Sequence, residues 1–281
     1  MTTAATIHPP RLAAPLALFF ALFFAVPLVL LLGVSLQAGE AGGYGLSQYA
    51  RFFADGLGAR VLSRTLLIGL ETTIACLLLG YPLALIYRNA PPWGRSVITL
   101  IVLLPLLTSV VVRTFAWIVI LGRQGLVNTT LQSLGLIDLP LKLLYTEGGL
   151  IVALTQVQLP LMFLPLAGTL ARIPPNLEDA SAALGAGAWR TFFRVTLPLS
   201  IPGALAGCTL TFAAAVTAFI TQTLVGGGQM LLMPSYIYQQ AISLQNWPFA
   251  AAISMVFLAA VLAILALIAA LGRLAKGVAH V

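Results

Sequence analysis

Six long apolar segments dominate the chain, and short polar stretches separate them. They run approximately over residues 16–36, 65–87, 97–121, 149–170, 203–225 and 249–271. Each is close to the length of about 20 residues that a helix needs to cross a hydrocarbon core roughly 30 Å thick. None alternates apolar and polar positions as a barrel strand does, and a lone segment in lipid satisfies its backbone only as a helix. The pattern therefore predicts an all-α polytopic membrane protein with six transmembrane helices.

The composition agrees with a chain that is solvated by lipid. Hydrophobic residues make up 60% of the sequence and charged residues 7%, and the mean hydropathy is +1.04. A water-soluble fold with so few polar residues could not cover its core, which excludes the soluble classes. The net charge of +7 could suggest a nucleic-acid partner, but the basic residues are dispersed over short loops. We therefore expect no binding of nucleic acid.

Basic residues are more frequent on one predicted side of the membrane. That side holds the N-terminus and the loops after the second, fourth and sixth spans, with Arg11, Arg88, Arg95, Arg172, Arg190, Arg194, Arg273 and Lys276. The opposite loops carry Arg51, Arg60, Arg64, Arg123 and Lys142, offset by Glu40, Asp55, Asp138 and Glu147. Loops rich in Arg and Lys stay in the cytoplasm, so both termini are predicted to be cytoplasmic. The expected organisation is a cytoplasmic N-terminus at 1–15, a six-helix domain at 16–271 with a cytoplasmic loop at 171–202, and a cytoplasmic tail at 272–281.

Groups that support catalysis or metal binding are missing from the predicted spans. The two histidines, His8 and His280, stand at the ends of the chain, and the sequence has no H-E-x-x-H pair and no G-x-x-x-x-G-K-[ST] loop. Cys76 and Cys208 lie within spans, where thiols behave as small hydrophobic groups. We therefore expect no enzymatic activity, no metal and no cofactor, and any ATP that drives the protein should bind another chain.

The loop at 171–202 begins with signals for a short helix. Pro174-Pro175 should end the fourth membrane helix, because proline lacks a donor and disfavours helix in the residue before it. We expect Asn176 to cap a new helix, with Asp179 in the place of a capping-box acid. The surface of this helix consists of Ala, Ser and Gly, so another protein's backbone can approach it closely, and Gly185 should end it.

The second half of the loop predicts an amphipathic helix at the membrane surface. Aromatic residues and two arginines recur there at helical spacing, at Trp189, Arg190, Phe192, Phe193 and Arg194. Pro198 and Pro202 should stop this helix before the fifth span.

The loop as a whole resembles a transporter motif. Asp179-Ala180-Ser181 is followed by Gly185 and then by Val195-Thr196-Leu197-Pro198. This resembles the E-A-A, G and hydrophobic-x-L-P pattern of the membrane subunits of binding-protein-dependent ABC importers, with Asp179 in place of glutamate and Ser181 in place of the second alanine. The resemblance implies a type I ABC importer permease fold in a bacterial inner membrane, in which a coupling helix docks in a groove of a separate ATPase. The residues implied in this coupling are Glu178, Asp179, Ala180, Ser181, Ala182, Leu184, Gly185 and Ala186. Small residues that merely pack membrane helices are the alternative.

The third span narrows the resemblance. Its residues are similar to those of spermidine/putrescine-type permeases at Pro105, Thr108, Ser109, Arg113, Thr114, Trp117, Leu121, Gly125 and Asn128, as is the stretch Asn246-Trp247-Pro248-Phe249. The resemblance implies two copies of an ATPase subunit, a second permease, a periplasmic solute-binding protein, and a small solute such as a polyamine, an opine-like or a related amino compound. The alternative is a self-contained secondary transporter or channel that no ATPase drives.

Two charged residues lie inside the predicted spans. Glu71 and Arg113 should sit roughly 9 and 10 Å below the outer ends of their helices, at about 1.5 Å per residue. Since charges at that depth are costly and usually paired or functional, we expect these two to form a pair or to share a polar network. The pair could serve helix packing or gating.

A polar stripe marks candidate pathway residues. They are Trp117, Gln156, Thr217, Phe219, Thr221 and Gln222. Thr217 and Thr221 share a helix face, but Ser and Thr hydroxyls also satisfy themselves on helix carbonyls. Polyamine permeases often carry an acidic residue just before this phenylalanine, whereas this chain has Ala218, so neutral, zwitterionic and opine-like solutes are candidates as well.

Overall fold

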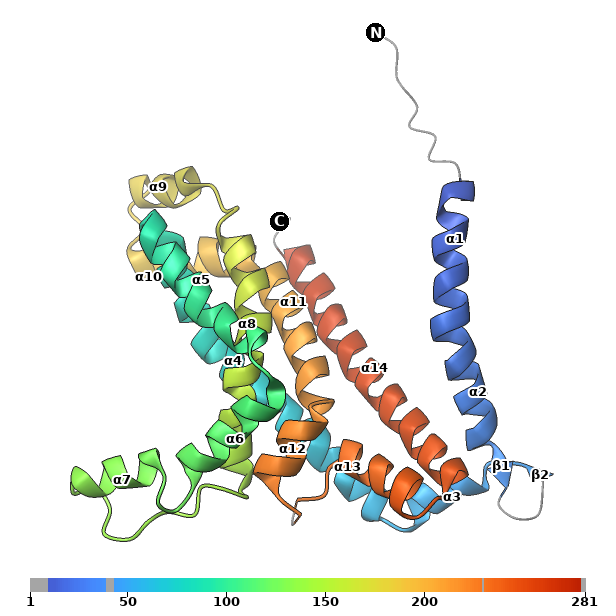
Figure 1. The fold of residues 1–281 in the computed structure, drawn as a ribbon. Coiled ribbons are helices and arrows are strands. Elements are labelled where there is room, and N and C mark those ends of the chain that lie inside the picture. Colours follow the sequence, from blue (N-terminus) through green and yellow to red (C-terminus); the bar gives the residue numbers. More distant parts are fainter. Residues whose placement is uncertain (1–9, 39–42, 229, 279–281) are drawn as a thin grey trace. The chain divides into compact units, whose positions relative to one another are not determined.

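The computed structural model describes residues 10–38, 43–228 and 230–278 and is almost entirely helical (Figure 1). Six of the described helices are long and apolar enough to cross a membrane, over Pro15–Ser35, Leu57–Asn89, Val110–Ser133, Glu147–Leu170, Ala188–Val216 and Trp247–Gly272. They confirm the prediction of six transmembrane helices, but not the bounds predicted for the third and the fifth. The cytoplasmic side of the termini stays a prediction, and His8, His280 and Glu40 lie outside the described residues.

The chain divides into two compact units. The first comprises Ile237–Ala259 with the described part of Met1–Ala59, and the second comprises Arg60–Tyr236 with the described part of Ala260–Val281. The first unit holds α1 (Pro10–Phe20), a π-helical turn η1 (Ala21–Ala25), α2 (Val26–Ser35), β1 (Gln37–Ala38), β2 (Gly43–Tyr44), α3 (Ser47–Ala54), a π-helical turn η4 (Gln239–Ser243) and the first part of α14 (Trp247–Val278).

Polar contacts fix α3 within the first unit. The Tyr49 hydroxyl lies 2.7 Å from the Ser35 hydroxyl at the end of α2, and the Arg51 guanidinium lies 4.3 Å from the centre of the Phe249 ring. The two short strands pair antiparallel, with Gln37 opposite Tyr44. The apolar helix before them is exposed along nearly its whole length, as a helix that faces lipid would be.

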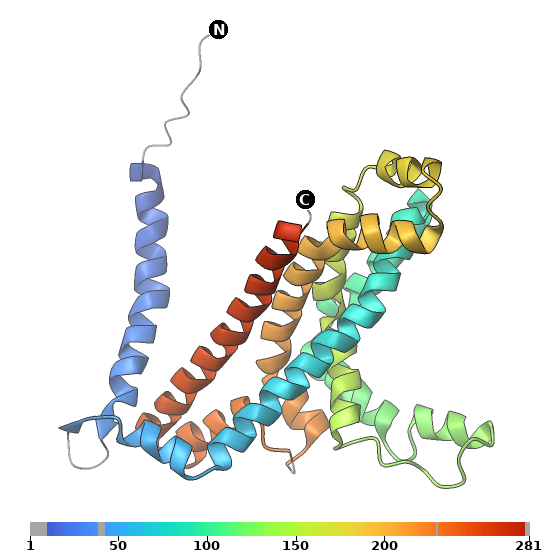
Figure 2. The ribbon, with the colours of Figure 1, turned by 180° about the vertical axis from the view of Figure 1, so that it is seen from behind.

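The remaining elements lie wholly or mostly in the second unit. These are α4 (Leu57–Asn89), α5 (Pro92–Leu107), α6 (Val110–Leu121), α7 (Leu126–Ser133), α8 (Glu147–Leu170), α9 (Pro175–Ala183), α10 (Ala188–Thr191), a π-helical turn η3 (Phe192–Thr196), α11 (Leu197–Val216), α12 (Phe219–Gly226) and α13 (Met233–Tyr238). Helix α8 is the most buried of them, and α11 runs alongside it (Figures 1 and 2).

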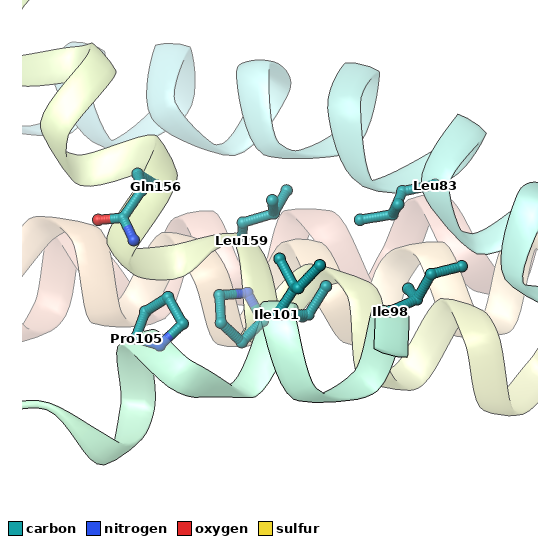
Figure 3. A pocket seen from close by; sticks show the side chains of 8 residues that line it. Leu83, Ile98, Ile101, Pro105, Gln156 and Leu159 are labelled. Carbon is teal, nitrogen blue, oxygen red and sulfur yellow. The ribbon is translucent and has the colours of Figure 1, made fainter. Parts of the chain in front are cut away.

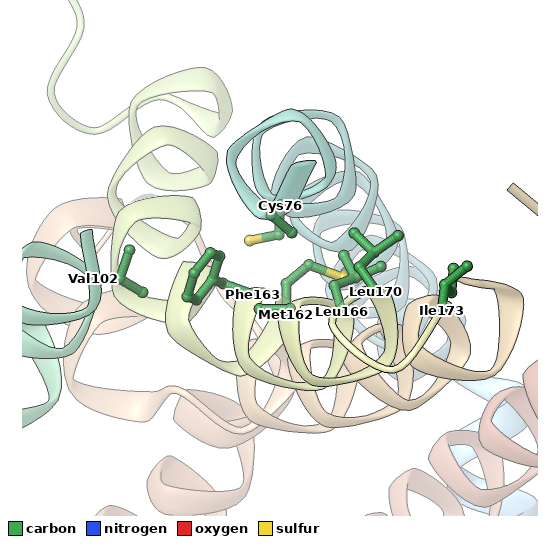
Figure 4. Close-up of a cluster of buried hydrophobic side chains, with 9 residues drawn as sticks. Cys76, Val102, Met162, Phe163, Leu166, Leu170 and Ile173 are labelled. Carbon is green, nitrogen blue, oxygen red and sulfur yellow. The ribbon is translucent and has the colours of Figure 1, made fainter. Parts of the chain in front are cut away.

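The core of the second unit lies along α8. Met162, Phe163 and Leu166 project from α8 toward Cys76 of α4, and Val102 of α5 lies on the other flank (Figure 4). All five side chains are at most 5% exposed. Lipid supplies no hydrophobic driving force for this packing, so close fit of the side chains holds these helices together.

Two glycines bring α11 and α8 into close approach. Gly203 and Gly207 are four residues apart, so they lie on the same face of α11. A Cβ atom added at Gly203 would lie 2.8 Å from the carbonyl oxygen of Pro165, and one at Gly207 would lie 2.9 Å from that of Met162. Real Cβ atoms do not come so close to backbone atoms. The pair is therefore a small-xxx-small contact of the kind that packs membrane helices.

Two of the predicted spans are interrupted. The expected continuous helix at 97–121 is wrong, because α5 ends at Leu107 and α6 begins at Val110. The expected helix at 203–225 is wrong as well, because α11 ends at Val216 and α12 begins at Phe219. The first break has a local cause, since Pro105 cannot donate to the preceding turn.

The start of the fifth span also differs from the prediction. Pro198 and Pro202 do not separate it from the amphipathic segment, because α10, η3 and α11 form one continuous helical run from Ala188 to Val216. Pro198 lies inside this run, directly after the π-helical turn η3, so its missing N–H does not end the helix. The amphipathic segment therefore connects rigidly to the membrane helix.

We predict that Gly207→Ala lowers the free energy of unfolding by about 1–3 kcal/mol, because its methyl group would press on the backbone of α8. The matched control is Gly168→Ala on α8, where an added Cβ meets nothing within 4 Å. The control should leave stability unchanged or raise it slightly. Thermal unfolding of the detergent-solubilised protein measures both, and equal losses in the two variants would contradict the close approach.

Candidate coupling helix and pathway residues

The short helix predicted after Pro174-Pro175 is present as α9. It begins at Pro175, and its N-cap is Pro174 without a side-chain hydrogen bond, so the expected cap at Asn176 is wrong. Asn176 stands one position inside the helix instead. The proline at the first helical position lacks a donor where none is required.

Gly185 ends α9. Its φ of +80° lies in the left-handed region that glycine adopts without strain. The N–H of Gly185 donates to the carbonyl of Ala182 at 2.9 Å, and the N–H of Ala186 donates to that of Ser181 at 3.1 Å. This pair of bonds is the Schellman arrangement, which closes a helix and reverses the chain. The glycine of the motif thus ends α9 and lets the chain turn toward α10.

Most of the predicted coupling residues face outward. Asp179, Ala180, Ala182, Leu184 and Gly185 are exposed, and the side chain of Leu184 is 89% exposed. A leucine so exposed on a loop of small residues marks a surface that another molecule can cover. Ala186 is half-buried.

Two of the predicted coupling residues face inward. The Ser181 hydroxyl lies 2.9 Å from that of Thr191, which joins α9 to α10. Arg88, in the last turn of α4, donates from Nη1 to Glu178 Oε1 at 2.6 Å, and the Thr196 hydroxyl donates to the same oxygen at 2.7 Å. Glu178 therefore contacts its own chain.

The surroundings of Glu178 stabilise its charged form. The hydrogen bond from Arg88 is the main cause that lowers the pKa of this carboxyl below its ordinary value of 4.5, and the bond from Thr196 adds to the effect while partial burial opposes it. An open hollow of about 410 Å³ lies beside the pair, lined in part by Leu85, Asp179, Ala182 and Phe192. Glu178 is thus ionised at neutral pH and fixed in place.

The two intramembrane charges do not pair. Arg113 donates from Nη1 to the carbonyl of Pro105, and the salt bridges among the described residues are Arg64–Glu147 and Arg88–Glu178. Glu71 and Arg113 therefore form no direct salt bridge, and the shared polar network stays a prediction. The physical reason is the break between α5 and α6, which leaves carbonyl groups without helical partners close to Arg113.

Glu71 lies on the exposed stripe of α4. It is half-buried, and the neighbours at helical spacing, Leu67, Ile74 and Leu78, are 54%, 56% and 68% exposed. A carboxylate on an apolar stripe at this depth is costly against lipid, so we expect that face to meet water or another chain in the assembled protein.

The pathway candidates gather around the two helix breaks. Trp117 of α6 donates from Nε1 to Gln156 Oε1 of α8 at 3.1 Å, and the Thr221 hydroxyl of α12 lies 3.3 Å from that of Thr114. Thr114 was not among the predicted pathway residues, although it lies one turn before Trp117. The structure thus brings candidates from α6, α8 and α12 close together.

Two further candidates satisfy the end of α11. Gln222 donates from Nε2 to the carbonyl of Ala215 at 2.8 Å, and Thr217 donates to that of Ala213 at 2.7 Å. Gln222 is buried, whereas Thr217 is exposed and Phe219 is half-buried at the start of α12. These polar groups therefore stabilise the break, and Thr217 is the one whose side chain is also exposed.

An apolar cavity of about 250 Å³ reaches the same region. Leu83, Ile98, Ile101, Pro105 and Leu159 line it, and Gln156 brings one polar side chain to its edge (Figure 3). No cluster of three or more His, Cys, Asp or Glu side chains suited to a metal occurs within residues 10–38, 43–228 and 230–278.

The sequence of this chain is similar to those of known transport proteins. Residues 76–277 match the family described as "Binding-protein-dependent transport system inner membrane component". The chain is 34% identical to the "Spermidine/putrescine transport system permease protein PotB" of Haemophilus influenzae over 237 residues, which cover 83% of this chain and 82% of that one. It is 30% identical to the "Putative 2-aminoethylphosphonate transport system permease protein PhnU" of Salmonella typhimurium over 246 residues, which cover 87% and 85%.

Solved structures share the fold at lower identity. A subunit of a bacterial ABC transporter that imports the acidic polysaccharide alginate superposes with a TM-score of 0.75 at 19% identity, covering 94% of each chain. A subunit of the MetNI methionine ABC transporter gives a TM-score of 0.54 at 20% identity, covering 79% of this chain and 96% of that one.

We predict that Glu178→Gln lowers the free energy of unfolding by about 1–3 kcal/mol at pH 7, because Arg88 loses a charged acceptor. Because the folded-state pKa of Glu178 lies below its ordinary value, its contribution is whole above pH 4.5 and is lost as the pH falls through the lowered pKa. Thermal unfolding from pH 7 downward should therefore show the gap to the native chain closing only below pH 4.5. A gap that closes at higher pH would show that the carboxyl is not stabilised as an anion.

Proposed function

Because this chain belongs to the family of inner membrane components of binding-protein-dependent transport systems, we propose that α9 is the coupling helix through which a separate ATPase drives import of a small amino compound. The chain is a permease subunit of an ABC importer and a multi-pass protein of the inner membrane. ATP hydrolysis takes place in another subunit, in agreement with the absence of a P-loop from the sequence.

The outward face of α9 is the observation that carries the coupling role. Asp179, Ala180 and Ala182 offer small side chains and one carboxylate, and Leu184 stands almost fully exposed beside them. Small residues let a partner's backbone approach closely, and an exposed leucine can fill a pocket on that partner. The alternative, a self-contained secondary transporter or channel, would not require a surface for an ATPase.

Further partners follow from the same family. We propose two copies of the ATPase subunit, one on each permease, a second permease that completes the pathway, and a periplasmic protein that delivers the solute. One relative of similar fold was solved in complex with an alginate-bound periplasmic protein, which supports the last of these by analogy.

The pathway should run past the two helix breaks. We propose that Trp117, Gln156, Thr217, Phe219, Thr221 and Gln222 line it or hold its wall, with Glu71 and Arg113 as the charges nearby. Thr217 is exposed at the break before α12, and the adjoining position holds Ala218, which brings no carboxylate. Glu71 would then be the one carboxylate among these residues for a doubly charged amine, so we propose a solute with one amino group, in zwitterionic or opine-like form.

We predict that Leu184→Arg abolishes association with the ATPase. A central anchor residue contributes about 2 kcal/mol or more, so affinity should fall at least roughly thirtyfold. Pull-down of the ATPase through an affinity tag on this chain measures the loss.

Leu139→Arg is the matched control, because Leu139 is also a highly exposed loop leucine, at 79%. It should retain the ATPase. Equal retention by both variants would contradict the docking surface, and uptake by this chain without any ATPase would restore the secondary carrier.

We predict that the complete importer takes up zwitterions in preference to polyamines. Cells that lack their own polyamine uptake and express the whole system would be given radiolabelled putrescine, 2-aminoethylphosphonate or octopine. Ala218→Asp should shift the ratio toward putrescine by about tenfold, since a new carboxylate pairs with the second amine. Preferred uptake of putrescine by the native chain would overturn the assignment of solute charge.

A further inference from the structure

We propose that Arg88 and Glu178 are positioning residues that latch the coupling helix to the cytoplasmic end of α4, so that movement imposed on α9 reaches the membrane helices. The inference rests on the proposed function, because it takes α9 as the element that the ATPase moves. It gives the two adjacent acids different tasks: Asp179 faces the partner, while Glu178 holds the helix to its own permease.

Three elements converge on one carboxylate oxygen. Glu178 Oε1 of α9 accepts hydrogen bonds from Arg88 of α4 at 2.6 Å and from Thr196 of η3 at 2.7 Å. The Arg88 side chain is 13% exposed, that of Glu178 is 32% exposed, and Thr196 is 4% exposed. Charge-assisted bonds in such partly buried surroundings have a narrow range of geometry. The three elements therefore cannot move independently while the bonds last.

A second link lies on α4 seven residues earlier. The Tyr81 hydroxyl is 2.7 Å from the Ser200 hydroxyl of α11, and its ring meets the Phe192 ring edge-on at 5.8 Å between centres. Seven residues correspond to about 10 Å along a helix. Helix α4 is thus joined to the run from α10 to α11 below the latch, and the latch adds α9 to the same body.

The contacts of α9 on its other flank complete this body. Ser181 lies 2.9 Å from Thr191 of α10. Without the latch, this contact and the chain connections at the two ends would hold α9, and a load on it could rotate the helix by itself. With the latch, the load passes to α4, which extends over Leu57–Asn89. A buried ion pair is weak evidence for stability, but it can specify a unique arrangement.

The same helix supplies a matched control. Arg64 of α4 forms a 2.5 Å salt bridge to Glu147 of α8, but the two side chains are 42% and 49% exposed. Exposed pairs contribute little and are screened by salt. Substituting Arg64 removes an ion pair from α4 without touching the latch.

The test measures coupling in the assembled transporter, purified through a tag on this chain and reconstituted in lipid nanodiscs. A reporter cysteine at Thr217 would be labelled with a maleimide, with and without ATP and vanadate, in a background in which Cys76 and Cys208 are alanine. We expect nucleotide to change the labelling rate at least about fivefold in the latch-intact transporter. Arg88→Gln and Glu178→Gln should each abolish this response while ATP hydrolysis continues, and the double variant should be no worse than either single one.

Controls separate the latch from a general loss of structure. Arg64→Gln should keep the full response, and Arg88→Lys should keep part of it because it retains the charge. Thermal unfolding of each variant shows whether a lost response is due to misfolding. We expect every variant complex that still hydrolyses ATP to be folded. A nucleotide response that persists in both Arg88→Gln and Glu178→Gln overturns the latch.

A separate cross-link distinguishes this failure from failure of the proposed function. A cysteine at Ala182 should cross-link to the ATPase subunit in the native background and in Glu178→Gln alike. If the native transporter gives no such cross-link, the coupling role of α9 fails and the latch fails with it. If the cross-link forms but both Arg88→Gln and Glu178→Gln still respond to nucleotide, only the latch is overturned.

Discussion

The requirement that every backbone polar group have a partner governs how this protein breaks its helices inside an apolar layer. A helix that stops in such surroundings leaves carbonyl groups that water does not reach. At the first break, Thr108 and Arg113 both donate to the carbonyl of Pro105. At the second, Gln222 donates to those of Ala215 and Val216. Side chains that look like solute ligands in the sequence are thus partly committed to the backbone.

This constraint explains which parts of the architecture could be predicted. The length of an apolar run determines whether a helix can span a membrane, and six such runs were recognisable without knowledge of any contact. The breaks at 107–110 and 216–219 were not, because each is marked only by two small or polar residues, Thr108-Ser109 and Thr217-Ala218, and membrane helices commonly contain such residues. Pro105 was a local signal for the first break. The second break has no proline near it. Gln222, which donates to the carbonyl groups at this break, is in sequence equally typical of a residue that faces a cavity.

The candidate site shows the same division between local and tertiary information. The end of α9 followed from Gly185, since glycine acts on the backbone at its own position, whereas its start did not, because Pro175 takes the first helical position ahead of the expected cap at Asn176. Which of two neighbouring acids faces outward did not follow, because that depends on Arg88, ninety residues earlier in the chain. The salt bridge of Glu71 with Arg113 is absent for a related reason: matched depth is necessary for a pair, but Arg113 donates from Nη1 to the carbonyl of Pro105, while its Nε is buried without a partner.

The second unit combines continuous, closely packed helices at one end with two interrupted helices farther along. The glycines of α11 bring it close to α8, and continuous helix joins the amphipathic segment to α11, so the end of this unit that carries α9 behaves as one body. The two breaks lie farther along the same chain path, where backbone regularity is interrupted and polar side chains meet. If the ATPase moves α9 as proposed, the displacement would pass along the continuous helix to the breaks, which the proposed pathway also passes. Thr217, exposed at the second of these breaks, is therefore the residue at which the proposed coupling and the proposed pathway would meet.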